Sequence, residues 1–202
     1  MVVYIKNIIF DLGGVILEGR SVSILDDMNL DKETYDKLKQ FFYYRKELDM
    51  GEMTLEEAFD SCNFSKELES LYKDKLLNYY KYRKINMRLI NMIRKLKNNN
   101  YNVYVLSDNI KEIIDYLKSN ELFKDIDGWV VSCDYKTIKK EGKLFDIILD
   151  KYNLEPSTCY FIDDNIDNVN VAISKGIKGF LFDDNIDSLI ENMKNNNIEI
   201  EG

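Results

Sequence analysis

Short apolar runs alternate with amphipathic stretches near the N-terminus and again from about residue 95 onward. The apolar runs have the length of strands and lie at residues 2–10, 101–107, 128–132, 158–162 and 177–182. Apolar positions recur at helical spacing between them, over residues 110–120, 143–152 and 167–175. Strands that alternate with helices predict βαβ units, and therefore an α/β fold with a parallel sheet and helices on both faces.

A different pattern fills the segment from about residue 18 to residue 84, where aromatic and aliphatic side chains recur at helical spacing. This periodicity is visible over residues 32–48 and 68–79, and the segment lacks a strand-like alternation. Thr54 and Glu57 have the spacing of a capping box, which predicts that a helix begins directly after Thr54. The pattern therefore predicts a compact helical insertion between the first strand and the rest of the sheet.

The next helix, expected around residues 87–96 with apolar positions three apart, belongs to the sheet unit again. This boundary divides the chain into two units. We expect a core made of residues 1–17 and 85–202, and a helical insertion made of residues 18–84. A chain of 202 residues is long enough for this arrangement.

The composition is that of an ordinary globular protein, with 45% hydrophobic and 32% charged residues. The 28 basic and 36 acidic residues give a net charge of −8, which does not favour nucleic acid or an anionic membrane as a partner. No apolar run approaches the length of a membrane span, and no signal-peptide pattern precedes the first strand. We therefore expect a cytoplasmic protein, while the oligomeric state stays unknown at this point.

The sequence contains no histidine, which excludes Ser–His–Asp triads, Cys–His dyads and metals bound by histidine. Any metal must then be held by oxygen atoms, the ligands that favour magnesium or calcium over zinc. The cysteines Cys62, Cys133 and Cys159 are an odd number without close spacing, so we expect reduced, structural thiols.

Polar residues stand at or after the C-terminal ends of the predicted strands. Asp11 follows the first run, and Gly13 and Gly14 after it let the backbone turn sharply. The residues that follow the next three runs are Ser107, Lys139, and the pair Asp163 and Asp164. Ligands of open parallel sheets bind at this edge, so these side chains can converge on one pocket.

These residue types suit phosphoryl transfer. A carboxylate such as Asp11 can attack phosphorus and form an aspartyl phosphate. Further carboxylates and a backbone carbonyl make an oxygen cage that suits Mg²⁺, and clustered carboxylates would repel one another without a cation. A hydroxyl and an ammonium can bind the remaining phosphoryl oxygens. The competing interpretation of Asp11 alone is an ordinary turn aspartate, and the order of the later motifs favours the catalytic role.

The same residues lie in motifs that resemble those of a known family. Four pieces of the chain look like the four signature motifs of the haloacid dehalogenase-like hydrolases. In order from the first to the fourth they are FDLGGV at 10–15, LSDN at 106–109, Lys139, and IDDNIDNV at 162–169. The helical insertion is similar to that family's helical cap. Residues 48–59 resemble a segment of the branch that includes bacterial α-glucose-1-phosphate phosphatases and the phosphatase domain of soluble epoxide hydrolases.

The resemblance implies a Rossmann-like core with an inserted helical cap. It implies a Mg²⁺-dependent phosphatase that hydrolyses a small phosphorylated metabolite, such as a sugar phosphate, with Asp11 as the nucleophile. The Mg²⁺ ligands implied are Asp11, the carbonyl of Gly13, Asp163 (directly or through water) and Asp164. The residues implied to bind the substrate phosphate are Ser107 and Lys139, with Asn109 and Asn168 as supporting candidates.

The lysine of the third motif has several neighbours. The family usually has proline after this lysine, whereas Lys140 follows Lys139 here, and Lys136 and Lys143 lie nearby. The register with Phe145 favours Lys139, and the adjacent lysines stay open as alternatives for the phosphate ligand.

Gly13 is the more consequential departure, because most phosphatases of the family have aspartate at this position as the acid for the leaving group. Glycine keeps the carbonyl but removes that acid, and general acid–base catalysis contributes about 10²–10⁴-fold. We therefore expect a substrate with an acidic leaving group, such as an anomeric, enolic or acyl phosphate. A catalytically silent binding protein and a phosphomutase or phosphotransferase stay open as alternatives, whereas a dehalogenase has no evident use for Asp163 and Asp164.

The letters DDNID occur twice, at residues 163–167 and 183–187. A single metal-binding position can use only one copy. The first copy lies at the expected distance after Lys139, so we assign the second copy to helix capping.

Overall fold

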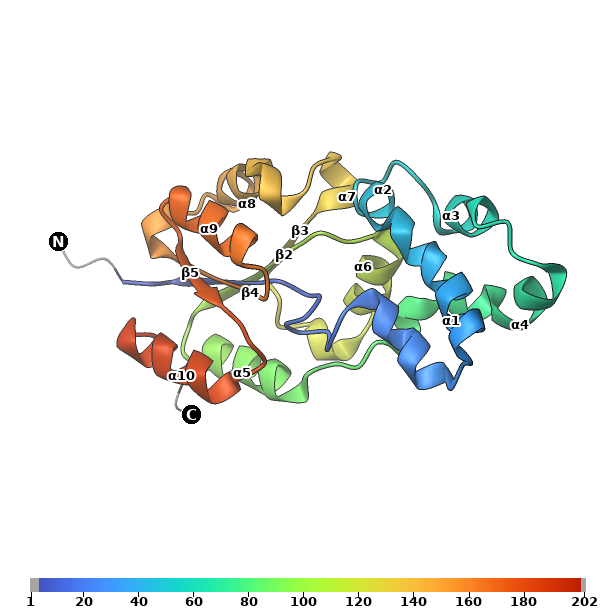
Figure 1. Ribbon diagram of the computed structural model, residues 1–202. Helices are drawn as coiled ribbons and strands as arrows, with labels where there is room; N and C mark the ends of the chain where they lie inside the picture. The colour runs from blue at the N-terminus through green and yellow to red at the C-terminus, as the bar shows by residue number, and fades with distance from the viewer. Residues whose placement is uncertain (1–3, 201–202) are drawn as a thin grey trace.

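The computed structural model describes residues 4–200, and within them five parallel strands form one sheet (Figure 1). The strands are β1 (Asn7–Phe10), β2 (Asn102–Ser107), β3 (Gly128–Val131), β4 (Cys159–Asp163) and β5 (Lys178–Leu181). Their order is β3-β2-β1-β4-β5, so the chain builds outward from β1 on one side and then on the other. Where the direction in which strands are added reverses, between β1 and β4, a crevice is left at the carboxyl ends of these strands. The predicted α/β fold with a Rossmann-like parallel sheet is confirmed.

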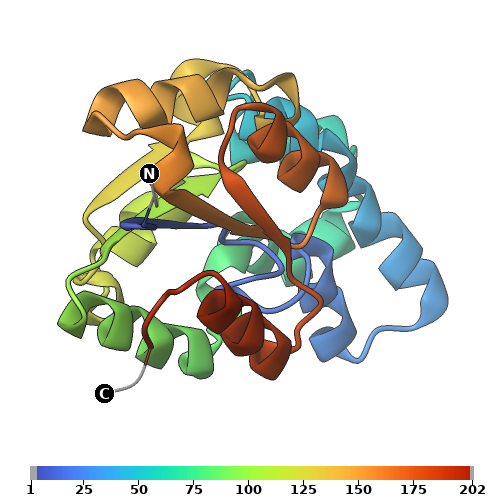
Figure 2. The same cartoon turned by 90° about the vertical axis from the view of Figure 1, so that its left-hand side faces the viewer.

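Helices cover both faces of the sheet. They are α5 (Met87–Asn98), α6 (Lys111–Lys118), α7 (Ser132–Tyr135), α8 (Lys143–Tyr152), α9 (Ile166–Ser174) and α10 (Ile186–Asn195). Helices α8 and α9 lie on one face, and α5 and α10 lie on the other (Figure 2). Along β1, Ile9 packs into the cluster on the first face, and Ile8 and Phe10 pack into the cluster on the second. Burial on both faces explains why the strands are apolar along their whole length.

The strand at the N-terminus is shorter than the apolar run predicted at residues 2–10. Residues 2 and 3 lie outside the described residues, and β1 begins at Asn7. Asn7 stands opposite Asn102 and Cys159, the first residues of the two neighbouring strands. Because β2 and β4 both begin there, the described residues before Asn7 have no strand on either side with which to pair. The other four predicted strands agree with the structure to within one residue at each end.

Helices fill the chain between β1 and α5, and Figure 1 shows α1, α3 and α4 at one end of the molecule, beyond the sheet. The elements are η1 (Ser21–Met28), α1 (Lys32–Lys39), η2 (Gln40–Tyr44), α2 (Arg45–Asp49), α3 (Leu55–Ser61), α4 (Lys66–Leu77) and η3 (Tyr79–Tyr82). The capping box predicted at Thr54 is present, with Glu57 bonded back to the Thr54 backbone. The helix expected over residues 32–48 is interrupted by the tighter turn η2, which packs Phe41 and Phe42 edge-on against Tyr79.

The chain enters and leaves this helical segment side by side. Leu17 forms bridges with both Gly13 and Ile85. The backbone N–H of Glu18 donates to the carbonyl of Lys84 at 2.9 Å. The two connections are therefore held together where the helical segment joins the sheet unit.

The loops of the sheet unit contain the short turns η4 (Glu121–Phe123), η5 (Lys139–Glu141) and η6 (Pro156–Thr158). Cys62, Cys133 and Cys159 are free thiols, as the sequence predicts. Over residues 4–200, no helix combines the length and apolar character that crossing a bilayer requires.

Candidate functional site

Three aspartates meet at the carboxyl edge of the sheet. Asp11 follows the last residue of β1, and Asp163 ends the neighbouring strand β4, with Asp164 directly after it. One carboxylate oxygen of each lies within 4.8 Å of the others. Asp11 and Asp163 are buried and Asp164 is exposed, so the cluster opens to solvent on one side. The sequence predicted this convergence, because parallel strands end at one edge.

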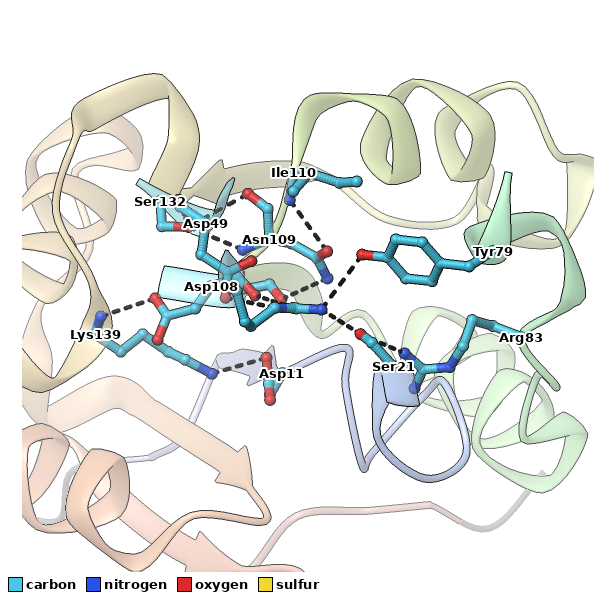
Figure 3. A network of polar contacts seen from close by, with 12 residues as sticks. Asp11, Ser21, Asp49, Tyr79, Arg83, Asp108, Asn109, Ile110, Ser132 and Lys139 are labelled. Carbon is cyan, nitrogen blue, oxygen red and sulfur yellow. Dashed lines mark hydrogen bonds and ion pairs between the residues drawn. The ribbon is translucent and has the colours of Figure 1, made fainter. Parts of the chain in front are cut away.

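Lys139 reaches this cluster from the loop after β3 (Figure 3). Its Nζ lies 2.8 Å from Oδ1 of Asp11 and 2.5 Å from Oδ2 of Asp163. The side chain is 2% exposed, which is rare for lysine unless it is paired. Although burial favours the neutral amine, Asp11 and Asp163 hold the pKa of Lys139 above its usual range, so it stays an ammonium.

The structure also distinguishes Lys139 from the three other lysines near it in the sequence. Lys136 and Lys143 are exposed, and Lys140 is an exposed partner of Asp167 at 3.2 Å. Among the four lysines considered from the sequence, Lys139 alone contacts the aspartate cluster. Its position is fixed by the backbone, since the Lys139 N–H donates to Oδ1 of Asp108 at 2.8 Å.

The pKa of Asp11 is unusually high for a carboxyl group. Burial raises the pKa of Asp11 to about 7, the ammonium of Lys139 opposes this rise, and the charge of Asp163 adds to it. Burial and the charge of Asp163 also raise the pKa of Asp164. One ammonium therefore does not balance the group, and a bound cation would. Clustered carboxylate oxygens are the ligands that Mg²⁺ prefers, so the residues present fit this ion.

Asp163 is held in one orientation by its neighbours in the fourth motif. The backbone N–H of Asn165 donates to its Oδ1 at 2.8 Å, and the side-chain amide of Asn168 lies 3.2 and 3.1 Å from its two oxygens. Asn168 itself is buried. The carboxylate is thus positioned before any ligand arrives.

The two glycines after Asp11 have different surroundings. Gly14 has a φ of +78°, and a Cβ added there would overlap the carboxylate of Asp164. A Cβ added at Gly13 would meet nothing within 4 Å, and Gly13 borders the cavity of the site. The positive φ therefore favours glycine at position 14, and a side chain there would displace Asp164, whereas position 13 has room for a side chain.

Ser107 ends β2 and Asn109 follows shortly after it, and neither is among the residues that line the cavity of the site. Both are buried, and the Asn109 amide lies 3.5 Å from Oγ of Ser107. The Asn109 backbone N–H donates to Oγ of Ser132 at 2.8 Å, and its side-chain oxygen accepts from the N–H of Ile110 at 3.1 Å. Asn109 thus shapes the start of α6. The direct phosphate contacts expected for Ser107 and Asn109 stay predictions.

The cluster opens into a cavity of about 620 Å³, a size typical of small-molecule sites. The helical segment contributes Arg20, Ser21, Val22, Phe42, Arg45, Asp49 and Arg83 to its lining, and the loop after β2 contributes Asp108. Sequence reasoning assigned none of these residues to the site. Asp108 had a signal, since it lies within the second motif, and Asp49 lies in residues 48–59, which resemble a segment of one family branch. The others come from segments that the sequence marks only as helix or connection.

A network of side chains fixes the wall that faces the aspartates (Figure 3). Nε of Arg45 donates to Oδ2 of Asp49 at 2.6 Å, and Nη1 of Arg45 donates to Oγ of Ser21. Nη1 of Arg83 lies 3.2 Å from the same Ser21 oxygen. Burial lowers the pKa of Arg83 to about 10, with the charge of Arg45 adding to the effect, so both guanidinium groups stay charged at neutral pH.

The second DDNID sequence has the capping role assigned to it. Asn185 is the N-cap of α10, and its side chain accepts from the N–H of Ser188 at 3.1 Å. Asp183 accepts from the Asn185 N–H at 3.2 Å. The lining of the cavity includes Asp164 and Asn165 from the first copy and no residue from the second.

A relative of known activity covers nearly the whole chain. The chain is 26% identical over 192 residues to the D-ribitol-5-phosphate phosphatase of Bacteroides thetaiotaomicron. The aligned region covers 87% of this chain and 91% of that protein.

Solved structures share the fold. A HAD family enzyme from Bacteroides thetaiotaomicron in complex with magnesium and inorganic phosphate has a TM-score of 0.65 and 21% identity, over 88% of this chain and 93% of that one. A predicted HAD-like family hydrolase from Porphyromonas gingivalis has a TM-score of 0.69 and 22% identity, over 94% of this chain and 98% of that one.

The sequence profile of the haloacid dehalogenase-like hydrolases matches residues 5–174, which include Asp11, Lys139 and the pair Asp163 and Asp164. The match therefore spans the sheet edge and the helical segment together. The chain belongs to the haloacid dehalogenase-like hydrolases.

Proposed function

We propose that this protein is a Mg²⁺-dependent phosphatase that hydrolyses a small phosphorylated metabolite. The observation that carries the proposal is the buried ammonium of Lys139, 2.8 Å from Asp11 and 2.5 Å from Asp163. The arrangement puts a nucleophilic carboxylate, a phosphate-binding cation and two further metal-binding carboxylates around one point. The similarity to D-ribitol-5-phosphate phosphatase supports the same reaction and makes D-ribitol 5-phosphate the first metabolite to test. Because this substrate is an alkyl phosphate, a sugar 1-phosphate tested beside it shows whether the absence of an acid at Gly13 favours the more acidic leaving group.

In this proposal each residue of the cluster has one role. Asp11 is the nucleophile and, with the Gly13 carbonyl, Asp163 and Asp164, holds Mg²⁺. Lys139 and Ser107 bind the phosphoryl oxygens, with Asn109 as a further, supporting candidate beside Ser107. Asn168 keeps Asp163 oriented.

The reaction proceeds in two displacements at phosphorus. A carboxylate oxygen of Asp11 forms a bond to phosphorus as the bond to the ester oxygen breaks, and the alkoxide departs with a proton from solvent. Lys139 balances the charge of the phosphoryl oxygens. Mg²⁺, when bound, neutralises charge on the phosphoryl group. Water then attacks phosphorus and gives up a proton to solvent as the bond between phosphorus and the Asp11 oxygen breaks, which releases inorganic phosphate and restores the carboxylate of Asp11.

Residues 18–84 form the cap in this proposal, and residues 1–17 and 85–202 form the catalytic core. The side-by-side connections at Leu17 and Ile85 support this division, because they are the two places where the chain passes between the units. Cap residues such as Arg45 face the cavity and would exclude water and select the substrate.

The proposal is tested by phosphate release from p-nitrophenyl phosphate, whose leaving group needs little protonation. We expect activity that requires Mg²⁺ and is lost in Asp11→Asn, whereas Asp36→Asn, an exposed change on the cap, keeps it. Folded, Mg²⁺-loaded wild type that releases no phosphate from this ester or from D-ribitol 5-phosphate would contradict the proposal and favour a silent binding protein.

A further inference from the structure

Asp49 places a carboxylate in the cap wall of the cavity, with one of its two oxygens lacking a partner. Its side chain is 10% exposed and borders the cavity. Oδ2 accepts from Nε of Arg45 at 2.6 Å. Oδ1 is buried and has no hydrogen-bond partner in the described part of the chain. A buried acceptor without a donor is costly, so its presence beside a ligand cavity calls for an explanation.

Both ends of Asp49 are fixed, so the unpaired oxygen is not an accident of a mobile side chain. Oγ of Ser132 donates to the Asp49 backbone carbonyl at 2.5 Å, which ties this residue to the core. Arg45 in turn donates through Nη2 to the carbonyl of Asp108 at 3.1 Å, so the guanidinium that orients Asp49 is itself held by the core. The structure thus holds an unpaired acceptor in the wall of the cavity, on a residue whose backbone carbonyl and Oδ2 are both fixed.

The charge already paired with Asp49 indicates which kind of donor fits. The cavity is bordered by four cations and four carboxylates, which are Arg20, Arg45, Arg83, Lys139, Asp11, Asp49, Asp108 and Asp164. The negative charge of Asp49 is matched by the guanidinium of Arg45, 2.6 Å from its Oδ2. A neutral hydroxyl can therefore donate to Oδ1 without adding an unmatched charge. The volume of about 620 Å³ leaves room beyond the phosphate for several hydroxyl-bearing carbons.

We propose that Asp49 is a specificity-determining residue that accepts a hydrogen bond from a substrate hydroxyl, so that the substrates are sugar or polyol phosphates. This inference rests on the proposed phosphatase function. On this proposal the Asp49 carboxylate turns about its Cβ–Cγ bond when the substrate binds, so that the substrate hydroxyl can donate to Oδ1. A substrate that lacks the hydroxyl leaves this acceptor unpaired and is discriminated against.

The test compares five-carbon polyol phosphates with their monodeoxy analogues and with n-pentyl phosphate, in wild type and in Asp49→Asn. In the variant, Nε of Arg45 still needs an oxygen, so the amide NH₂ takes the place of Oδ1 and a donor replaces the acceptor. We expect wild type to lose about 10–100-fold in kcat/KM when one particular hydroxyl is removed. In Asp49→Asn the same deletion should cost less than about threefold, because the partner is already gone.

Asp36→Asn is the matched control, because it makes the same charge change at an exposed position of the cap. It should keep the full wild-type discrimination. Two results overturn the inference: wild type that hydrolyses n-pentyl phosphate as well as the polyol phosphates, or a deoxy penalty that is equal in wild type and Asp49→Asn. The first comparison needs no variant and so does not depend on how Asp49→Asn folds. If wild type does not hydrolyse p-nitrophenyl phosphate at all, that is a separate result, which contradicts the proposed function itself.

Discussion

Nζ of Lys139 lies 2.8 Å from Oδ1 of Asp11, and both side chains are buried at the carboxyl edge of the sheet. A buried pair of this kind is strongly destabilised when one partner is removed, because the other charge is left uncompensated. The pair is therefore expected to matter both for stability and for the positioning of the Asp11 carboxylate, and its neighbours in sequence allow the two effects to be separated.

Lys139→Met should lower kcat/KM for p-nitrophenyl phosphate by about 10²–10³-fold, since it removes the cation that we propose to bind the phosphoryl oxygens. Lys140→Met is the control, because Lys140 is exposed and pairs with Asp167 outside the cluster. Steady-state kinetics on both variants, with circular dichroism to verify folding, makes the comparison. Equal activities of folded Lys139→Met and Lys140→Met would contradict the assigned role.

Gly13→Asp should accelerate the hydrolysis of simple alkyl phosphates by about 10²-fold or more, because it supplies a general acid beside a poor leaving group. The position can accept the side chain, since a Cβ there meets nothing within 4 Å. The rate with p-nitrophenyl phosphate should change far less, and Gly13→Ala should change neither rate. If Gly13→Asp leaves alkyl phosphate turnover as it was, the missing acid does not limit this enzyme.

Gly14→Ala should destabilise the protein by about 1–3 kcal/mol, because an L-residue at a φ of +78° is strained and its Cβ would overlap Asp164. Displacement of Asp164 should also weaken Mg²⁺ binding. Gly13→Ala provides the neighbouring control with open space around its Cβ. Urea unfolding gives the stability, and titration with Mg²⁺ gives the affinity; equal stabilities of the two variants would argue against the packing at Gly14.

Mg²⁺ should raise the melting temperature more at about pH 8 than at about pH 5.5, because the proton on Asp11, whose pKa is about 7, competes with the ion at low pH. The pKa of Asp11 is raised from 3.8 in the unfolded chain to about 7 in the folded protein. In the metal-free protein the protonated Asp11 therefore stabilises the fold fully below about pH 4, and this stabilisation is lost as the pH rises through 7. Mg²⁺ compensates for this loss. Thermal melts at both pH values make the measurement, and Asp11→Asn, which has no carboxyl to titrate there, should lose most of the difference.

The fold and the aspartate cluster could be predicted from the sequence for a simple physical reason. Short apolar runs between amphipathic segments predict a parallel sheet, and residues at the ends of parallel strands converge without further information. Asp11, Asp163 and Asp164 meet on this account. The start of β1 at Asn7 was missed because the length of a strand depends on where its neighbours begin.

The choice of Lys139 among four nearby lysines needed the tertiary structure. The family register favoured it, but local chemistry could not separate residues of one type within eight positions. Only the path of the loop after β3 buries one ammonium against Asp11 and leaves the others in solvent.

The sequence by itself therefore determined the α/β sheet, the helical insertion and the acidic edge, because each depends on the periodicity and order of residues along the chain. The tertiary structure alone decided the cap wall. Arg45 and Asp49 lie one turn apart on α2, whereas Ser21 and Arg83 come from other segments. Arg45 and Arg83 meet at Ser21 through contacts between residues as far as 62 positions apart. Such contacts depend on how the helices pack against one another, and hydrophobic periodicity sets which face of a helix is buried but not which polar residues then meet.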